Sequence, residues 1–98
     1  MYLQSMPQNE GMLFVHEKLD KQYYWMANTY MFLDILFLDE NKSIVDIQKM
    51  QPCNQPLTKN CKRYVSSKPS LYAIELNQNV SDICNISVGS IASWSKVE

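Results

Sequence analysis

The sequence predicts a mainly-β fold, a small barrel-like or sandwich domain of short antiparallel strands with one or two short helical turns. Short apolar or alternating runs recur along the chain, and turn-forming residues separate them. The 98 residues are 46% hydrophobic and 19% charged, which is typical of a globular chain with one modest core. We therefore expect residues 1–98 to form a single domain.

The amino-terminal half is expected to contain a central hairpin. A short apolar run predicts a strand over residues 11–15, and the charged residues 17–21 predict a loop. Residues 22–26 and 34–38 would then form the two arms of the hairpin. The second arm is apolar on both faces, which is typical of a central strand or of the wall of a filled barrel.

The carboxyl-terminal half is expected to alternate between turns and half-exposed strands. Residues 39–42 predict a tight turn, and residues 43–50 and 71–76 alternate as strands do when one face is buried. Residues 51–70 hold three of the four prolines and predict a long loop. The last predicted elements are a helical turn over 77–84, with Asn79 as its cap, and a strand over 88–94.

Several short motifs occur along nearly the whole chain in one order, and together they resemble the domain of unknown function 192 family. They are NEGMLF at 9–14, WMANT at 25–29, LDI at 33–35, PC at 52–53, YAIELN at 72–77 and VG at 88–89. The resemblance implies a compact, mainly-β, barrel-like domain. It implies no activity, because the family has none assigned. Many relatives are exported, so the resemblance favours a periplasmic or extracellular location.

The chain departs from the family pattern at three places. Ala27 stands where relatives usually have Lys, and Gln78-Asn79 follows Asn77 where relatives have Gly. Met1-Tyr2 resembles the middle of the family's first motif, and relatives carry a further strand before it. We therefore expect an amino-terminally truncated domain with one unpaired strand edge, through which the chain could self-associate.

Composition argues against several classes of function. A net charge of −1 offers no electrostatic attraction for nucleic acid or for an anionic membrane surface. No apolar run approaches the roughly 20 residues of a transmembrane helix. His16 is the only histidine and lacks zinc-type Cys or His spacing around it, so we interpret it as an ordinary surface residue and expect no metal and no cofactor. Two glycines and no nucleophile motif argue against a phosphate loop or a serine hydrolase.

A polar cluster in an apolar setting provides the candidate binding site. Asn28 and Thr29 interrupt the predicted hairpin at its corner, and Asp34 interrupts its second arm. These groups could hydrogen-bond a ligand at the mouth of a barrel, with Trp25 and Glu75 beside them. The alternative is structural: Asp34 would turn back and hold the backbone of the Asn28–Thr29 corner, since a buried carboxylate must find partners.

The cysteines predict one disulfide. Cys53 and Cys61 flank a proline-bearing segment that has little core of its own, so a covalent link between them would stabilise it. A bridge requires a Cα separation below about 7 Å. Cys84 lies on the apolar side of the predicted helical turn and is expected to be buried and free.

These observations favour a non-enzymatic binding or accessory domain whose ligand is a small molecule, a glycan or an extended peptide. The alternative is a small hydrolase-like enzyme that uses Asp34 or Glu75 as a general base. The pKa distinguishes them, because a base needs a carboxyl shifted toward neutrality. A third hypothesis, a partner-binding subunit, requires an exposed apolar patch around Tyr23 and Trp25.

Overall fold

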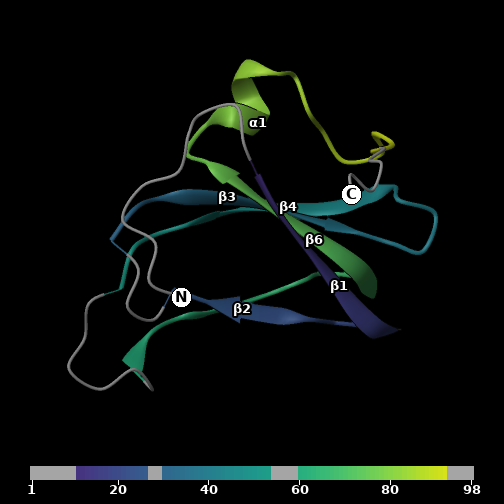
Figure 1. The fold of residues 1–98 in the computed structure, drawn as a ribbon, viewed down its shortest axis with the longest axis horizontal. Coiled ribbons are helices and arrows are strands. Elements are labelled where there is room, and N and C mark those ends of the chain that lie inside the picture. Colours follow the sequence, from purple (N-terminus) through teal and green to yellow (C-terminus); the bar gives the residue numbers. More distant parts are fainter. Residues whose placement is uncertain (1–10, 27–29, 54–59, 93–98) are drawn as a thin grey trace, which may run out of the picture.

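The computed structural model describes residues 11–26, 30–53 and 60–92, and these form two antiparallel sheets and one short helix. Figure 1 shows the arrangement of the elements. In chain order they are β1 (Gly11–Asp20), β2 (Tyr23–Trp25), β3 (Leu33–Leu38), β4 (Ile44–Met50), β5 (Arg63–Val65), β6 (Ser70–Asn77) and α1 (Val80–Ile83).

The larger sheet has four strands in the order β1-β6-β3-β4, and β3 lies at its centre. All six residues of β3 are buried, because β4 and β6 pair with its two edges and side chains cover both its faces. A strand covered on both faces is apolar at nearly every position, and β3 is so except at Asp34, whereas a strand covered on one face only would alternate. The predicted central strand over 34–38 is therefore confirmed.

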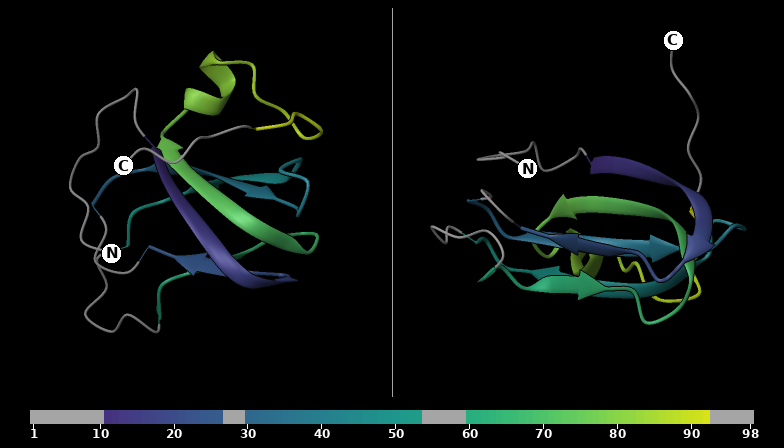
Figure 2. Two further views of the ribbon diagram at one scale, coloured as in Figure 1. Left: turned by 45° about the vertical axis from the view of Figure 1, so that its right-hand side comes forward. Right: turned by 90° about the horizontal axis from the view of Figure 1, so that it is seen from below.

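The smaller sheet, β2 and β5, faces the larger one and encloses the main core (Figures 1 and 2). Phe37 from β3 and Tyr64 from β5 meet in this core. The other buried members are Met26, Leu33, Ile35, Met50 and Ala73. This face of the larger sheet is called the inner face below.

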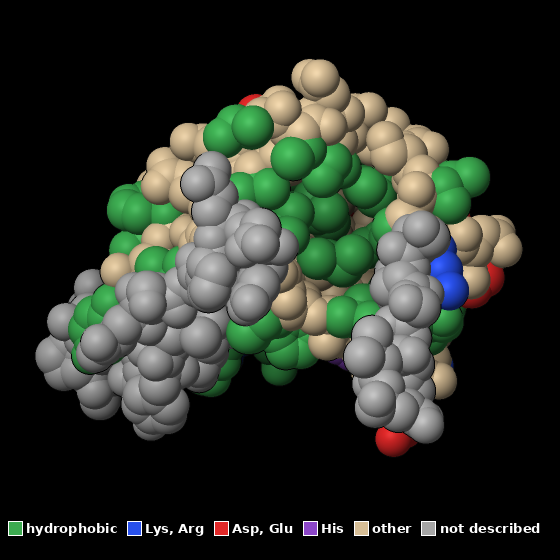
Figure 3. Space-filling model, turned by 45° about the horizontal axis from the view of Figure 1, so that its top comes forward, with side chains coloured by type: hydrophobic (Ala, Val, Ile, Leu, Met, Phe, Trp, Pro, Cys, Tyr) green, Lys and Arg blue, Asp and Glu red, His purple; other side chains and the backbone are tan. Residues whose placement is uncertain are grey.

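The opposite, outer face of the larger sheet carries a second apolar cluster. Leu36, Leu38 and Ile44 are buried there, and Ile86 and Ala92 from the chain after α1 pack against them. Figure 3 shows hydrophobic side chains gathered in the middle of the surface seen from the α1 side. The two clusters follow from the period of two along β3, which sends alternate side chains to opposite faces.

The mainly-β class with short antiparallel strands is confirmed, whereas the closed barrel is not. Within the described segments the two sheets share no ladder that would join them into a cylinder. Of the two architectures that the sequence left open, the chain adopts the one with two facing sheets.

The predicted hairpin between residues 22–26 and 34–38 is wrong. Tyr23 pairs with Val65 in the β2–β5 ladder, while β3 pairs with β4 and β6. Apolar periodicity identifies a strand but does not specify its partner, and here the partner of β2 comes from the segment predicted to be a loop. The predicted corner, Asn28 and Thr29, lies outside the described residues.

Three further expectations differ from the structure. Strand β1 continues to Asp20 through residues predicted to be a loop, because Asp20 still pairs with Ser70. Asn79 occupies the position before α1, but its side chain makes no capping hydrogen bond, and it adopts φ 67°. The last predicted strand is reduced, in the part described, to a bridge between Ser43 and Ile91.

Candidate functional site

The carboxylate of Asp34 lies at the centre of a network of hydrogen bonds between strands and helix. Asp34 lies directly opposite Lys49 in the β3–β4 ladder, and both side chains point to the outer face. Its Oδ2 accepts hydrogen bonds from the Ser81 hydroxyl at 2.6 Å, the Ser81 N–H at 3.2 Å and the Lys49 ammonium at 3.1 Å. The ammonium of Lys49 also lies 2.8 Å from Asp82. One carboxylate therefore connects β3, β4 and the first turn of α1.

Hydrogen bonding keeps Asp34 ionised. Burial alone would raise its pKa, but hydrogen bonding from Ser81, from Lys49 and from the backbone of Asn79 outweighs burial, and the pKa lies below its usual value. The other oxygen, Oδ1, is buried and has no described hydrogen-bond partner in good geometry, although the Asn79 backbone also acts on the carboxylate. A buried acceptor without a partner is costly, so this oxygen is the natural place for a donor from outside the described chain.

A pocket of about 240 Å³ opens at this end of β3 and β4, and we call it the Asp34 pocket. One part of its wall is apolar and includes the exposed ring of Phe32. The rest is polar and combines a carboxylate, an ammonium and three amide groups. The lining residues are Phe32, Leu33, Asp34, Lys49, Met50, Gln51, Gln78 and Asn79.

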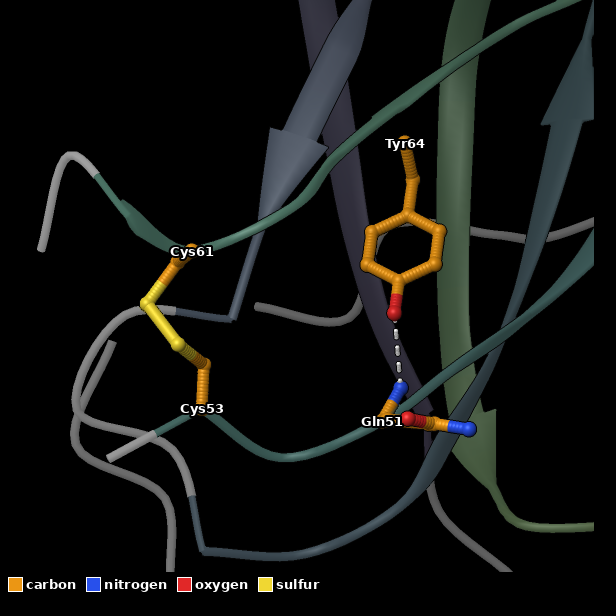
Figure 4. The surroundings of a disulfide bond; sticks show 4 residues. All are labelled: Gln51, Cys53, Cys61 and Tyr64. Carbon is orange, nitrogen blue, oxygen red and sulfur yellow. Dashed lines mark hydrogen bonds between the residues drawn. A yellow bond between two sulfur atoms is a disulfide. The ribbon is translucent and has the colours of Figure 1, made fainter. Parts of the chain in front are cut away.

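A second pocket, of about 180 Å³, lies beside the disulfide and is called the disulfide pocket. It is lined by Met26, Gln51, Pro52, Cys53, Lys62 and Tyr64. The phenol oxygen of Tyr64 accepts a hydrogen bond from the Gln51 N–H at 3.0 Å (Figure 4). Gln51 lines both pockets, so Tyr64 holds the backbone of a residue that borders each of them.

Cys53 and Cys61 form a disulfide with a Cα separation of 5.8 Å, within the limit set above (Figure 4). Cys61 is buried and Cys53 lies on the wall of the disulfide pocket. The free Cys84 is exposed, so its predicted burial is wrong. It belongs to the short turn that ends α1, where one helical turn covers too little surface to bury every apolar position.

Glu75 occupies the opposite, inner face of the same sheet. Its register neighbours are Met12 on β1 and Ile35 on β3, and its side chain has no exposed surface. Neither carboxyl oxygen has a hydrogen-bond partner among the residues described. Burial raises the pKa of Glu75 to about 7. Burial, and with it the charge of Glu75, also raises the pKa of the Tyr24 phenol.

Comparison with known proteins identifies the family. The sequence profile of the family described as DUF192, an uncharacterized ACR, matches residues 1–94. The chain belongs to the DUF192 family. Among curated proteins, none matches it.

Two solved structures resemble this DUF192 domain. A protein of unknown function from Novosphingobium aromaticivorans has a TM-score of 0.83 and 24% identity, over 96% of this chain and 64% of that one. A candidate transcription regulator from Sinorhizobium meliloti has a TM-score of 0.79 and 30% identity, over 91% of this chain and 65% of that one. The DUF192 domain therefore spans less than two thirds of the length of either protein. The likeness to the Novosphingobium protein shows the fold alone.

The structure separates the predicted site residues. Asp34 faces outward and Glu75 inward, so these two carboxyl groups do not share a site. The ring of Trp25 lies on β2, outside both described pockets, with the Arg63 guanidinium 4.9 Å from its centroid. Asn28 and Thr29 lie outside the described residues. The predicted contact of Asp34 with that corner therefore also falls outside the described residues, and the described partners of Asp34 are Ser81 and Lys49.

His16 is half-buried and hydrogen-bonded to the Tyr24 hydroxyl. Its ring also meets that of Tyr24 edge-on. Burial lowers the pKa of His16. The described segments contain no group of three or more His, Cys, Asp or Glu side chains placed to hold a metal ion. No helix in them is long and apolar enough to cross a membrane.

Sequence reasoning missed Lys49, Gln51, Gln78 and Ser81 as site residues. The sequence shows Lys49 as a charged residue in an alternating strand, but nothing near it in the sequence links it to Asp34. The link requires the β3–β4 register, which joins residues 15 positions apart. Ser81 lies 47 positions from Asp34, and no pattern within the sequence relates them.

Replacing Asp34 tests its structural role. We expect Asp34→Ala to lower the unfolding free energy by about 1–3 kcal/mol, because the buried donors of Ser81 lose their acceptor. Asp34→Asn keeps an oxygen and should cost less. Urea unfolding at pH 7 measures both changes, and Ser81→Ala completes a double-mutant cycle with Asp34→Ala. Additive effects of the two changes would show that the hydrogen bond between them contributes no stability.

Glu75 should make the domain less stable as the pH rises. The unfolded chain releases this proton near 4.5, whereas the folded domain holds it until about 7, so stability falls between those values. At about 1.4 kcal/mol per pKa unit, the loss amounts to about 3 kcal/mol. The melting temperature of Glu75→Gln minus that of the unmodified domain should therefore be larger at pH 8 than at pH 5.

The exposed Glu40→Gln serves as the matched control, because it makes the same chemical change at the surface. Thermal melts of the three proteins from pH 4 to pH 8 provide the comparison. A difference between Glu75→Gln and the unmodified domain that stays constant with pH would contradict a raised pKa for Glu75.

Proposed function

We propose that this DUF192 domain is a non-enzymatic binding domain whose ligand occupies the Asp34 pocket. The observation that carries the proposal is the oxygen Oδ1 of Asp34, which is buried in a pocket-lining residue and has no partner among the described groups. A ligand that donates an O–H or N–H to this oxygen would remove the cost of leaving it unpaired.

The surroundings of Asp34 support access for such a ligand. Asp34 has no exposed surface, so one lining side chain must move before a ligand reaches Oδ1. Lys49 is suited to this movement, since its side chain is 48% exposed and long. When its ammonium leaves Asp34, the contact with Asp82 at 2.8 Å can still hold it.

The chemistry of the pocket also restricts the ligand. The ammonium of Lys49 already faces the two carboxylates of Asp34 and Asp82, so an anionic ligand would meet a neutralised cation beside a net negative charge. The amides of Gln51, Gln78 and Asn79 can both donate and accept hydrogen bonds. A small, uncharged ligand with several hydrogen-bonding groups fits this combination best.

A small hydrolase-like enzyme is the second candidate. Asp34 does not suit a general base, because its pKa is lowered and a weaker base results. The pKa of Glu75, about 7, does suit one, but neither described pocket includes Glu75. Ester hydrolysis by the purified domain that disappears in Glu75→Gln would favour this candidate over binding.

A partner-binding surface is supported by the outer side of β2 and β5. Tyr23 and Trp25 are exposed there, and the Arg63 guanidinium lies over both rings, at 5.8 and 4.9 Å from their centroids. Tyr, Trp and Arg are the residues that contribute most to protein interfaces. A role in transcription, which the name of the Sinorhizobium protein suggests, is disfavoured by the net charge of −1.

The disulfide supports a location outside the cytoplasm. Disulfides persist in oxidising compartments such as the periplasm and the extracellular space, and cytosolic reductants normally keep such thiols apart. The Cys53–Cys61 bridge thus agrees with the export that the family resemblance favours. Thiol labelling of the protein taken directly from its native compartment would show whether the bridge is formed there.

Binding to the Asp34 pocket can be tested by NMR titration. We expect uncharged polyhydroxylated probes such as glucose, N-acetylglucosamine and glycerol to shift the backbone amides of Lys49, Gln51 and Gln78 in the ¹⁵N-labelled domain. Gln78→Ala should weaken this binding, because an amide of the wall is lost. The matched control is Asn60→Ala, which shortens an exposed amide outside both pockets. If none of the probes shifts these amides, the proposed site is wrong.

The amino-terminal edge of the larger sheet supports self-association. Strand β1 pairs with β6 on one side, and its outer face exposes Leu13 at 41% and Val15 at 65%. Such edges pair with other chains, and a lysine placed on them opposes this. Sedimentation velocity should show concentration-dependent association of the domain that Val15→Lys reduces. Identical sedimentation of the two proteins at all concentrations would rule out association through this edge.

A further inference from the structure

We infer that the Asp34 pocket and the disulfide pocket are two subsites of one groove, and that the groove binds an oligosaccharide of at least two sugar rings. The inference rests on the proposed function, because it assigns a ligand class to the Asp34 pocket. It adds a second subsite that the Asp34 carboxylate does not reach.

Gln51 joins the two pockets. It is the one residue that lines both in the part of the chain that the structure describes, so a ligand that fills them together passes its side chain. The backbone of Gln51 is held by the Tyr64 phenol at 3.0 Å, and in Figure 4 its side chain extends away from the Tyr64 ring. An exposed amide on a fixed backbone is well placed to hydrogen-bond the link between two ligand units.

Each pocket has a ring and at least one amide on its wall. The Asp34 pocket has the exposed ring of Phe32 together with the amides of Gln78 and Asn79. The disulfide pocket is lined by Pro52, by the amide of Gln51 and by the buried Tyr64. Sugar rings present C–H groups on their faces and hydroxyl groups around their rims, so they use an apolar platform and planar amides at the same time. The volumes of about 240 and 180 Å³ are small, and each suits a single ring better than a larger group.

The charges favour a neutral ligand over a peptide with charged ends. In the first pocket the cation Lys49 is already paired with two carboxylates. In the second, the ammonium of Lys62 lies over the Tyr64 ring, 4.8 Å from its centroid, and is directed at the ring. Lys49 is therefore not placed to receive a carboxylate directly, and hydroxyl groups match the chemistry of the first pocket.

The test compares ligands of one and two rings. Glucose and cellobiose form one pair of probes, N-acetylglucosamine and N,N′-diacetylchitobiose form the second, and the dipeptide Ala-Ala is the probe for peptides. Calorimetric and NMR titrations of the full disulfide-bonded chain measure affinity and contact. We expect one disaccharide to bind about tenfold tighter than its monosaccharide, because the second ring binds as part of the same molecule. It should shift amides at both Gln78 and Lys62.

Two variants separate the subsites. Gln51→Ala should remove the advantage of the disaccharide over its monosaccharide, whereas Gln78→Ala should weaken both ligands by a similar factor. Asn60→Ala should leave all affinities unchanged. Circular dichroism confirms that each variant is folded before its binding is measured.

Each failure has a distinct meaning. Equal affinity for one ring and two rings would overturn the two-subsite groove while the Asp34 pocket still binds. Binding of Ala-Ala, but of no sugar, at the same amides would overturn the saccharide assignment and leave a binding site for another ligand. A lack of any shift in the Asp34 pocket with every probe, including glycerol, would overturn the proposed function and this inference together.

Discussion

The ionised carboxylate of Asp34, buried in the most apolar strand, is the constraint on which this end of the molecule depends. A buried charge requires partners, and the chain provides them from two other elements, Lys49 on β4 and Ser81 on α1. These contacts place the first turn of α1 over the end of the larger sheet. The wall of the Asp34 pocket, including Asn79 and Gln78, is positioned by the same interaction.

Two carboxyl groups on one sheet acquire opposite properties from their surroundings. Asp34 and Glu75 are both fully buried. Hydrogen-bond donors lower the pKa of Asp34. Glu75 has no donor among the described residues, so burial raises its pKa. The cause is the period of two along neighbouring strands, which sends Asp34 toward Ser81 and Glu75 toward the space between the sheets. The outer carboxylate suits recognition of a donor, and the inner carboxyl couples stability to pH.

The disulfide stabilises a part of the chain that has little secondary structure. Residues 51–53 and 60–62 lie between β4 and β5, and the bridge joins them across the undescribed segment 54–59. Closing a short loop in this way stabilises the fold mainly because it lowers the conformational entropy of the unfolded chain. The folded benefit is local, because the bridge and the Tyr64 hydrogen bond together hold Gln51 and Pro52 beside the two pockets.

The sequence by itself determined the local features of this domain. Runs of alternating or continuous apolar residues predicted β3, β4 and β6, and the positions of Cys53 and Cys61 predicted the bridge. Only the tertiary structure decided that β2 pairs with β5, that Asp34 meets Lys49 and Ser81, and that Gln51 lies between two pockets. The physical reason is that periodicity reports which side of a strand is buried, whereas partner choice depends on contacts between residues far apart in the chain.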